Sequence, residues 1–244
     1  MTSRTGTVTT LVVGATGATG RLLLTQLLGR GRALKVIVRS PEKLPPDVRK
    51  RVSVIHANLL ELSAADLAGH VRGCGAVASC LGHTISLRGI YGPPHKLVTE
   101  ATRRLHEAVS ANEPTAPVKF VLMNTAGNSN RDLNEPVSRA QGLVTSLIRH
   151  LVPPHADNEA AADYLRAAKD AALEWSVVRP DTLTSEDRVS AYEVHASPTR
   201  SAIFNPGKTS RINVAHFMAE LLTNEATWDK WKGQMPVIYN KTAT

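Results

Sequence analysis

Three glycines spaced three residues apart, Gly14, Gly17 and Gly20, follow directly on a run of β-branched and apolar residues at 7–13. A pattern typical of an amphipathic helix begins immediately after them. Gly14 permits a sharp turn, Gly17 has no Cβ to hold a ligand away from the backbone, and Gly20 allows the helix to pack closely on the strand. A helix N-terminus also offers free N–H groups and a partial positive charge to phosphates. This order of strand, turn and helix predicts a site for a dinucleotide pyrophosphate.

The glycine spacing, G-x-x-G-x-x-G, differs from the G-x-G-x-x-G of the standard fingerprint, and a tight turn without a ligand is the alternative interpretation. The strand before the turn and the helix after it favour cofactor binding. We expect the cofactor to contact the turn and the first turn of the helix, at Gly14, Thr16, Gly17, Ala18, Thr19 and Gly20.

Arg39 stands at the end of the next apolar run, 34–38, where an NAD-binding unit has an acidic residue for the ribose hydroxyls. A planar guanidinium binds a 2′-phosphate through two charge-assisted hydrogen bonds. Arg39 therefore favours NADP(H) over NAD(H). The alternative is a solvated arginine, because the chain carries a net charge of +8.

Apolar runs alternate with helical patterns along most of the 244 residues. Strands are expected near 7–13, 34–38, 52–56, 76–80, 118–123 and 175–178, and helices near 18–30, 96–112, 139–150 and 157–172. This alternation predicts an α/β fold, a Rossmann-like doubly wound parallel sheet with a small C-terminal substrate region. We expect 1–244 to be a single NAD(P)-binding domain in which 182–244 form a looser extension on the substrate side. That extension contains a helix near 214–222 and a last strand near 236–239.

Composition argues against several classes of function. No apolar run reaches about 18 residues, so no membrane span is expected, and the first residues lack the apolar segment of a signal peptide. Cys74 and Cys80 are too few and too close for a disulfide framework, which fits a reducing cytoplasm. Basic residues are scattered and aromatics make up 4%, so no nucleic-acid partner is expected.

Metal-ligand spacing and a G-x-S-x-G nucleophile elbow are also missing from the sequence. We therefore expect a cytoplasmic monomer or homodimer without a metal, whose partner is a small-molecule substrate.

Six short motifs, between residues 13 and 215, resemble the atypical short-chain dehydrogenase/reductases, most closely their NmrA-like and biliverdin-reductase-B-like NAD(P)H-binding group. The motifs are Val13-Gly-Ala-Thr-Gly-Ala-Thr-Gly20, Val38-Arg-Ser-Pro41, Ser79-Cys-Leu-Gly82, Asn124-Thr-Ala-Gly127, Trp175-Ser-Val-Val-Arg-Pro180 and Ser210-Arg-Ile-Asn-Val-Ala215. The resemblance implies a Rossmann-like core, NADPH as the cofactor and, in many members, reductase activity.

The resemblance also implies cofactor contacts after later strands. Asn58, followed by Leu59, stands where the family often has Asp, and its amide would bond the adenine edge. Leu81 and Gly82 would pass beside the nicotinamide ribose, and Pro180 would border the nicotinamide.

The chain departs from the standard Tyr-x-x-x-Lys of short-chain dehydrogenases, in which the tyrosine donates a proton and the lysine binds the ribose. Counting back from Leu165 puts the tyrosine position at Pro154 and the lysine position at Asn158. Asn158 is a candidate to bond the nicotinamide ribose in place of the lysine. Asn124, which opens the motif after the strand at 118–123, is a further cofactor candidate.

Three residues are candidates for catalysis. Thr125 matches the family's active-site Ser/Thr, whose hydroxyl orients a substrate carbonyl. His155 is a candidate proton donor, because an imidazole titrates near neutral pH, or it is a solvent-exposed residue beside an N-cap at Asp157. Tyr91 belongs to the loop 82–95, which is either part of a substrate pocket or lid, or a structural loop.

Other polar residues of the C-terminal part are weaker candidates. Arg200 and Arg211 are possible contacts for an anionic substrate, and 181–187 is interpreted as a solvated loop.

The sequence therefore favours an NADPH-dependent oxidoreductase that reduces a small-molecule carbonyl or conjugated substrate. The missing Tyr-x-x-x-Lys pair keeps two alternatives open. One is an NADP(H)-sensing regulator without turnover, and the other is a non-redox isomerase or cyclase that retains the cofactor.

Overall fold

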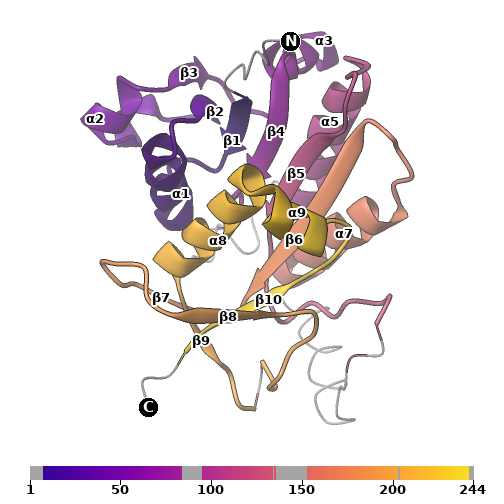
Figure 1. Ribbon diagram of the computed structural model, residues 1–244. Helices are drawn as coiled ribbons and strands as arrows, with labels where there is room; N and C mark the ends of the chain where they lie inside the picture. Colours follow the sequence, from indigo (N-terminus) through magenta and orange to yellow (C-terminus); the bar gives the residue numbers. More distant parts are fainter. Residues whose placement is uncertain (1–7, 84–94, 134, 136–152, 203, 242–244) are drawn as a thin grey trace, which may run out of the picture.

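The computed structural model describes residues 8–83, 95–133, 135, 153–202 and 204–241. Over these residues the strands form an eight-stranded sheet and a two-stranded sheet, and helices cover both faces of the larger one (Figure 1). The strands are β1 (Thr9–Val13), β2 (Ala33–Val38), β3 (Ser53–His56), β4 (Cys74–Ser79), β5 (Val118–Met123), β6 (Leu173–Pro180), β7 (Thr182–Thr184), β8 (Tyr192–His195), β9 (Lys208–Ser210) and β10 (Val237–Asn240). The helices are α1 (Ala18–Gly29), the 3-10 helix η1 (Pro41–Lys43), α2 (Pro46–Arg49), α3 (Ala64–Val71), α5 (Leu97–Ser110), α7 (Pro153–Ala167), α8 (Arg211–Thr223) and α9 (Glu225–Trp231).

The strand order of the large sheet is β3-β2-β1-β4-β5-β6-β10-β8. Neighbouring strands run parallel except for β10 and β8, which are antiparallel. The chain starts at β1, winds outward to β3, and then returns across β1 to build the other half from β4 onward. The predicted Rossmann-like doubly wound sheet is confirmed.

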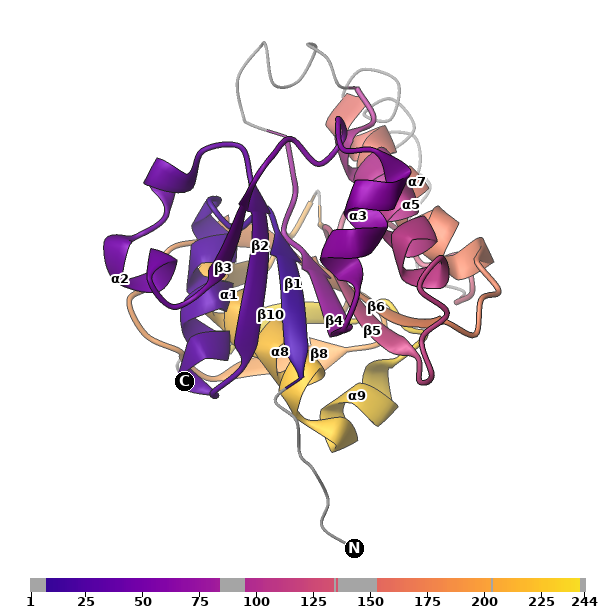
Figure 2. The same ribbon diagram turned by 90° about the horizontal axis from the view of Figure 1, so that it is seen from above.

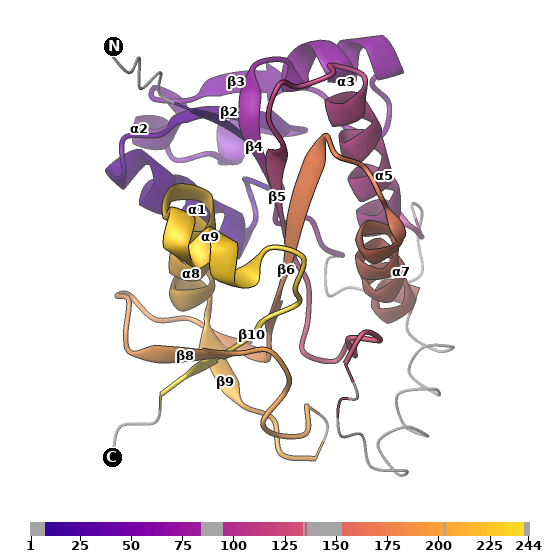
Figure 3. The same ribbon diagram turned by 45° about the vertical axis from the view of Figure 1, so that its right-hand side comes forward.

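Helices α1, α8 and α9 cover one face of the sheet, and α3, α5 and α7 cover the other (Figure 2, Figure 3). Successive strand residues point to opposite faces, so each strand contributes side chains to the hydrophobic core on both faces of the sheet. Val12 packs on the side of α1, whereas Leu11 and Val13 pack on the side of α5. Covered on both faces, the central strands are continuous apolar runs, as parallel strands usually are.

The strand order reverses at the C-terminal end of β1. Val13, the last residue of β1, is aligned with Ile37 of β2 on one side and with Ser79 of β4 on the other. In open α/β sheets a ligand binds in the crevice where strands diverge in this way, outside their carboxyl ends. The glycine turn that follows Val13 therefore lies at the expected ligand site.

Helix α7 differs from its prediction, since it runs over Pro153–Ala167 rather than 157–172. Pro153 and Pro154 were expected to break the chain before the helix, but they occupy its first turn. A proline is tolerated there because the first N–H groups of a helix have no intrahelical acceptor. The helix predicted at 139–150 lies outside the described residues.

The C-terminal part contains more regular structure than its sequence pattern predicts. The helix expected near 214–222 is α8, and the last strand is β10. Strands β7, β8 and β9 and helix α9 were not predicted, because elements of three to seven residues are too short for a periodic signal. β10 and β8 extend the main sheet beyond β6, while β7 and β9 pair separately next to them (Figure 1).

Candidate functional site

The turn after β1 brings two backbones into close contact. Gly14 has a φ of +71°, and a Cβ added to it would lie 2.4 Å from the carbonyl carbon of Cys80. A Cβ on Gly20 would lie 2.2 Å from the carbonyl oxygen of Gly14. Both distances are far shorter than any normal carbon contact, so both positions require glycine. The sharp turn at Gly14 and the close packing at Gly20 agree with the roles inferred from the sequence.

The N-terminus of α1 forms a cradle that no side chain among the described residues caps. Gly17 is the N-cap, no side chain caps the first turn, and that turn carries no acidic residue. The N–H groups of Ala18, Thr19 and Gly20 have no acceptor within the helix. Thr16 is partly exposed, Gly17 and Ala18 are exposed, and Thr19 is buried. An open helix start of this kind suits a phosphate, so a pyrophosphate fits the residues present.

Arg39 is exposed directly after β2, and it has no ion-pair partner among the described residues. Its carbonyl oxygen lies 3.2 Å from Nε2 of His56, on the neighbouring strand β3. The guanidinium is therefore available to an anionic ligand at the β1–β2–β3 half of the sheet.

The two candidates after β3 have local partners. Nδ2 of Asn58 donates to Oε1 of Glu61 at 2.7 Å, and its Oδ1 accepts the N–H of Leu60 at 3.3 Å. Leu59 is 7% exposed and packs into the core on the side of α5. A bond from Asn58 to an adenine edge would have to replace or share the bond to Glu61.

Leu81 and Gly82 follow β4 and stand beside the glycine turn, because Cys80 N–H donates to the carbonyl oxygen of Val13 at 3.0 Å. Burial raises the pKa of the Cys80 thiol to about 12, so this thiol is not a nucleophile at neutral pH. Leu81 is partly buried and Gly82 is exposed.

Asp157 does not cap its own helix. It lies inside α7, and its carboxylate accepts the N–H groups of Val98 and Thr99 at 2.7 and 2.9 Å, in the first turn of α5. Nε2 of His83, just after Gly82, lies 2.8 Å from the same carboxylate. Asp157 is thus a buried cap for a second helix, and it fixes the chain that leaves β4. The expected N-cap role in its own helix is wrong.

Asn124 ties the end of β5 to α7. Its Nδ2 donates to the carbonyl oxygen of Asn158 at 2.8 Å, and its Oδ1 accepts the N–H of Thr125 at 2.8 Å. The Asn124 amide is therefore occupied by protein groups. These two hydrogen bonds position the neighbouring Thr125 and the backbone of Asn158.

Thr125, Gly127 and His155 lie together. Oγ1 of Thr125 accepts the N–H of Gly127 at 3.2 Å. A Cβ added to Gly127 would lie 3.3 Å from Cε1 of His155 and 3.6 Å from Oγ1 of Thr125. Both side chains are partly buried. The structure thus brings two of the three catalytic candidates to one place, after β5 and at the start of α7.

Arg179, which precedes Pro180, forms a buried ion pair that the sequence did not indicate. Its side chain is 0% exposed, and Nη2 lies 2.6 Å from Oε1 of Glu135, which is 4% exposed. Further donors reach the carbonyl oxygens of Asn128, Met235 and Ala196 at 2.7, 2.6 and 3.1 Å. This ion pair joins the segment that follows Thr125 to β6, to β10 and to the residues after β8.

Pro180 is buried, and its carbonyl oxygen accepts the N–H of Ala126 at 2.8 Å. The next residue, Asp181, is 9% exposed, and residues 182–184 form β7, so the interpretation of 181–187 as a solvated loop is wrong over its first four positions. Oδ2 of Asp181 accepts the N–H of Gly207 at 2.9 Å, and burial raises the pKa of this carboxyl. Nη1 of Arg211 donates to Oγ of Ser185 at 3.1 Å.

Some predictions fall outside this geometry. Tyr91, the third catalytic candidate, and most of the loop 82–95 lie outside the described residues. Within the described ranges, no group of three or more His, Cys, Asp or Glu could hold a metal ion. In the same part of the chain, no helix combines the length and apolar character that crossing a membrane requires.

The fold and the glycine cradle together define a Rossmann-fold protein with a dinucleotide site. The model of the NAD(P)H-binding family matches residues 14–225, from the first glycine of the turn to the start of α9. The chain therefore belongs to the NAD(P)H-binding family, and the resemblance to atypical short-chain dehydrogenase/reductases is confirmed. No curated protein sequence is significantly similar to this chain.

Solved structures share the fold along nearly the whole chain. The oxidoreductase ylbE from Lactococcus lactis is 18% identical with a TM-score of 0.68, and the match covers 97% of this chain and 93% of that one. A Rossmann-fold NAD(P)-binding family protein from Shigella flexneri is 19% identical with a TM-score of 0.64, covering 98% of both chains. A short-chain dehydrogenase/reductase from Veillonella parvula, in complex with NADP, is 14% identical with a TM-score of 0.68, covering 96% of this chain and 94% of that one.

Proposed function

We propose that the protein is an NADPH-dependent oxidoreductase that reduces a small-molecule carbonyl or conjugated substrate without a Tyr-x-x-x-Lys pair. The observation that carries the proposal is the position of two sets of residues at the same edge of the sheet. The open cradle of Gly14, Gly17 and α1 follows β1, and the cluster of Thr125 and His155 follows β5 and begins α7. The carboxyl ends of parallel strands share an edge, so a cofactor held by the first group extends toward the second.

The residues that would hold the cofactor divide into two sets. The turn 14–20 would bind the pyrophosphate, and Arg39 would bind the 2′-phosphate of NADP(H). Leu81, Gly82 and Pro180 would border the nicotinamide half. When bound, NADPH supplies a hydride.

The chain's own groups would orient the substrate and supply the proton. Oγ1 of Thr125 accepts the Gly127 N–H, which leaves its hydroxyl proton free to donate to a substrate carbonyl oxygen. His155 stands next to Gly127 and would be the proton donor, because an imidazole titrates near neutral pH. Asn124 and Asp157 would act only by positioning these residues and the chain after β4.

A regulator that binds NADP(H) without turnover is the second candidate. It is favoured by the lysine position, where Asn158 offers no charge and its backbone oxygen is bonded to Asn124. A non-redox isomerase or cyclase that retains the cofactor is a third possibility. We further expect a cytoplasmic monomer or homodimer.

The test is the loss of NADPH absorbance with a panel of aldehydes, ketones, enones, quinones and flavins. Turnover with one class is expected. Replacement of Thr125 by Val should lower kcat about 100- to 1,000-fold, while Thr125→Ser should retain most of it, since it keeps the hydroxyl. Tight NADPH binding without turnover on any class would favour the regulator instead.

A further inference from the structure

A cavity of about 520 Å³ lies within the C-terminal part of the chain, and we refer to it as the C-terminal cavity. Strands β7, β8, β9 and β10 contribute to its walls, together with the loop before β9. In Figure 1 these strands lie together at the lower end of the molecule, below α8. The proposed function leaves this cavity without a role.

The cavity is lined by three cationic side chains, Arg200, Lys208 and Lys241. None of them has a salt-bridge partner within 4.0 Å among the described residues. Two carboxylates also line the cavity, but Glu186 already accepts from Nδ2 of Asn240 at 2.6 Å and from Ser190 at 2.9 Å. The second, Glu193, lies 3.6 Å from His195. The lining therefore carries three cations against two carboxylates, a formal excess of one positive charge, and the buried carboxylate of Asp181 lies close enough to Arg200 to interact with it electrostatically.

One of the cationic side chains lies over a buried aromatic ring in the wall of the cavity. Tyr239 is 3% exposed, and the Cζ atom of Arg200 lies 5.9 Å from the centre of its ring. A Cβ on Gly207 would lie 2.3 Å from Cδ1 of Tyr239, so the backbone packs directly against the ring. Thr184, which also lines the cavity, has a buried hydroxyl oxygen without a hydrogen-bond partner in the described part of the chain. A buried hydroxyl beside exposed cationic side chains is suited to binding an anion.

One lining residue of the C-terminal cavity packs in the same apolar cluster as the residue after Thr125, whereas Arg39 lies in the other half of the sheet. Tyr239 packs in one apolar cluster with Ala126, the residue after Thr125. In the sheet, by contrast, β1, β4, β5 and β6 separate β10 from β2 and Arg39. An anion in the C-terminal cavity would therefore belong to the substrate, or to another small ligand, and not to the cofactor's third phosphate.

We infer that the substrate of this protein carries a carboxylate or phosphate group, and that Arg200 binds this group in the C-terminal cavity over Tyr239, with Lys208 and Lys241 adding long-range attraction. The inference extends the proposed reductase function. Only the statement that the bound anion belongs to a substrate rests on that function. Binding of an anion to the cavity itself needs no turnover, so the two claims can be tested apart.

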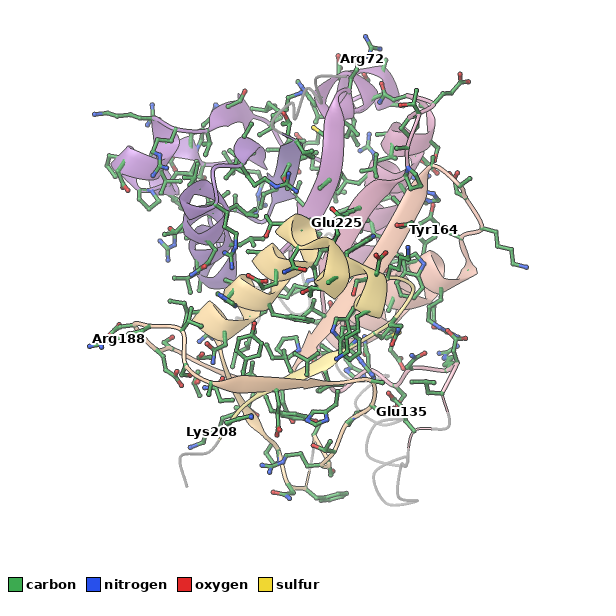
Figure 4. The ribbon with its side chains drawn as sticks, in the orientation of Figure 1. Arg72, Glu135, Tyr164, Arg188, Lys208 and Glu225 are labelled. Atoms are coloured by element: carbon green, nitrogen blue, oxygen red, sulfur yellow. The ribbon has the colours of Figure 1, made fainter. Side chains whose placement is uncertain are left out.

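The binding test is saturation-transfer NMR of the full chain with benzoate, its neutral analogue benzamide, and inorganic phosphate as a competitor. Benzoate is expected to bind more strongly than benzamide, phosphate should displace it, and Arg200→Gln should weaken it about 10- to 100-fold, as expected for a lost charge-assisted bond. Arg200→Lys should retain part of the affinity. Arg188→Gln is the matched control, because Figure 4 shows Arg188 on the β7–β8 loop, pointing away from the molecule and away from Lys208.

The turnover test compares 4-carboxybenzaldehyde with its methyl ester. A preference for the carboxylate in kcat/KM is expected, and Arg200→Gln should reduce that preference about 10- to 100-fold, whereas Arg188→Gln should not. Equal binding of benzoate and benzamide, or a preference that survives Arg200→Gln, would overturn the anion site. Arg200-dependent benzoate binding without oxidation of NADPH by either aldehyde or by any class of the panel above would support the anion site while rejecting the reductase.

Discussion

Arg179 and Glu135 form an ion pair with both side chains buried, with Nη2 and Oε1 2.6 Å apart. The two residues are 44 positions apart, and Glu135 also accepts the N–H of Asn130 at 2.8 Å. The pair holds the segment after Thr125 against β6 and β10, close to the candidate active site. Figure 4 shows Glu135 below α7, beside the end of the sheet.

Removal of Glu135 should therefore destabilise the fold strongly. Glu135→Ala leaves Arg179 charged and buried without its partner, and a broken buried pair costs about 3–5 kcal/mol. Asp132→Ala breaks an exposed pair with Arg166 and should cost about 1 kcal/mol or less. Urea unfolding measures both. Equal losses for the two variants would show that the buried pair contributes no more than an exposed one.

The glycine turn gives a second prediction with an internal control. Gly14 and Gly31 have φ angles of +71° and +72°, but only Gly14 has atoms within 4 Å of a built Cβ. Gly31→Ala should cost about 1–2 kcal/mol from the left-handed backbone alone. Gly14→Ala must in addition push Cys80 away, so it should lose more stability and abolish NADPH binding. Similar melting temperatures for the two variants would contradict the close approach of the turn to β4.

Asp157 caps α5 by accepting the N–H of a residue 59 positions earlier in the chain. Its removal should lower the free energy of unfolding more than the removal of an ordinary helix cap. Asp157→Ala leaves the buried N–H of Val98 without an acceptor, and each such group costs about 1–3 kcal/mol. Ser63→Ala removes an ordinary exposed cap of α3 and should cost about 1 kcal/mol. The free energies of unfolding of both variants provide the comparison. A smaller loss for Asp157→Ala than for Ser63→Ala would count against the second-helix cap.

Stability should fall on acidification, partly through His216. Burial and the charge of Arg30 lower the pKa of His216 from 6.5, and its Nδ1 lies 2.8 Å from the Tyr192 hydroxyl. The unfolded chain then binds this proton more readily, so the contribution to stability is present above pH 6.5 and is lost as the pH falls through the folded pKa. His216→Gln can still accept the Tyr192 bond but does not titrate. The loss of stability between neutral and mildly acid pH should be smaller in this variant, and an unchanged loss would rule out His216 as a contributor.

The regular part of the fold could be predicted from the sequence because its signals are local. The runs that became β1, β2 and β5 are apolar and end at turn residues. The spacing of the glycines in 14–20 indicates a sharp turn followed by a closely packed helix. Helix α7 was misplaced because prolines were interpreted as breakers, although the first turn of a helix accepts them.

The connections around the site could not be predicted in the same way. Glu135 bonds a residue 44 positions away and Asp157 caps a helix that starts 60 positions earlier in the chain, so no local pattern marks either one. The position of Thr125 and His155 beside Gly127 also depends on how the end of β5 and the start of α7 pack. The nearest sequence signal was the Arg-Pro after β6, which pointed to the cofactor rather than to the ion pair of Arg179.

We propose that the glycine turn binds the pyrophosphate and that Arg39 selects NADP(H) over NAD(H), and the dissociation constants of NADPH and NADH test this most directly. The wild-type chain should bind NADPH more tightly than NADH. Arg39→Gln should weaken NADPH about tenfold or more and leave NADH nearly unchanged, since a lost charge-assisted bond costs about 1.5–3 kcal/mol. Arg49→Gln, at another exposed arginine nearby in the sequence, should alter neither. Equal losses of NADPH and NADH in Arg39→Gln would contradict the account.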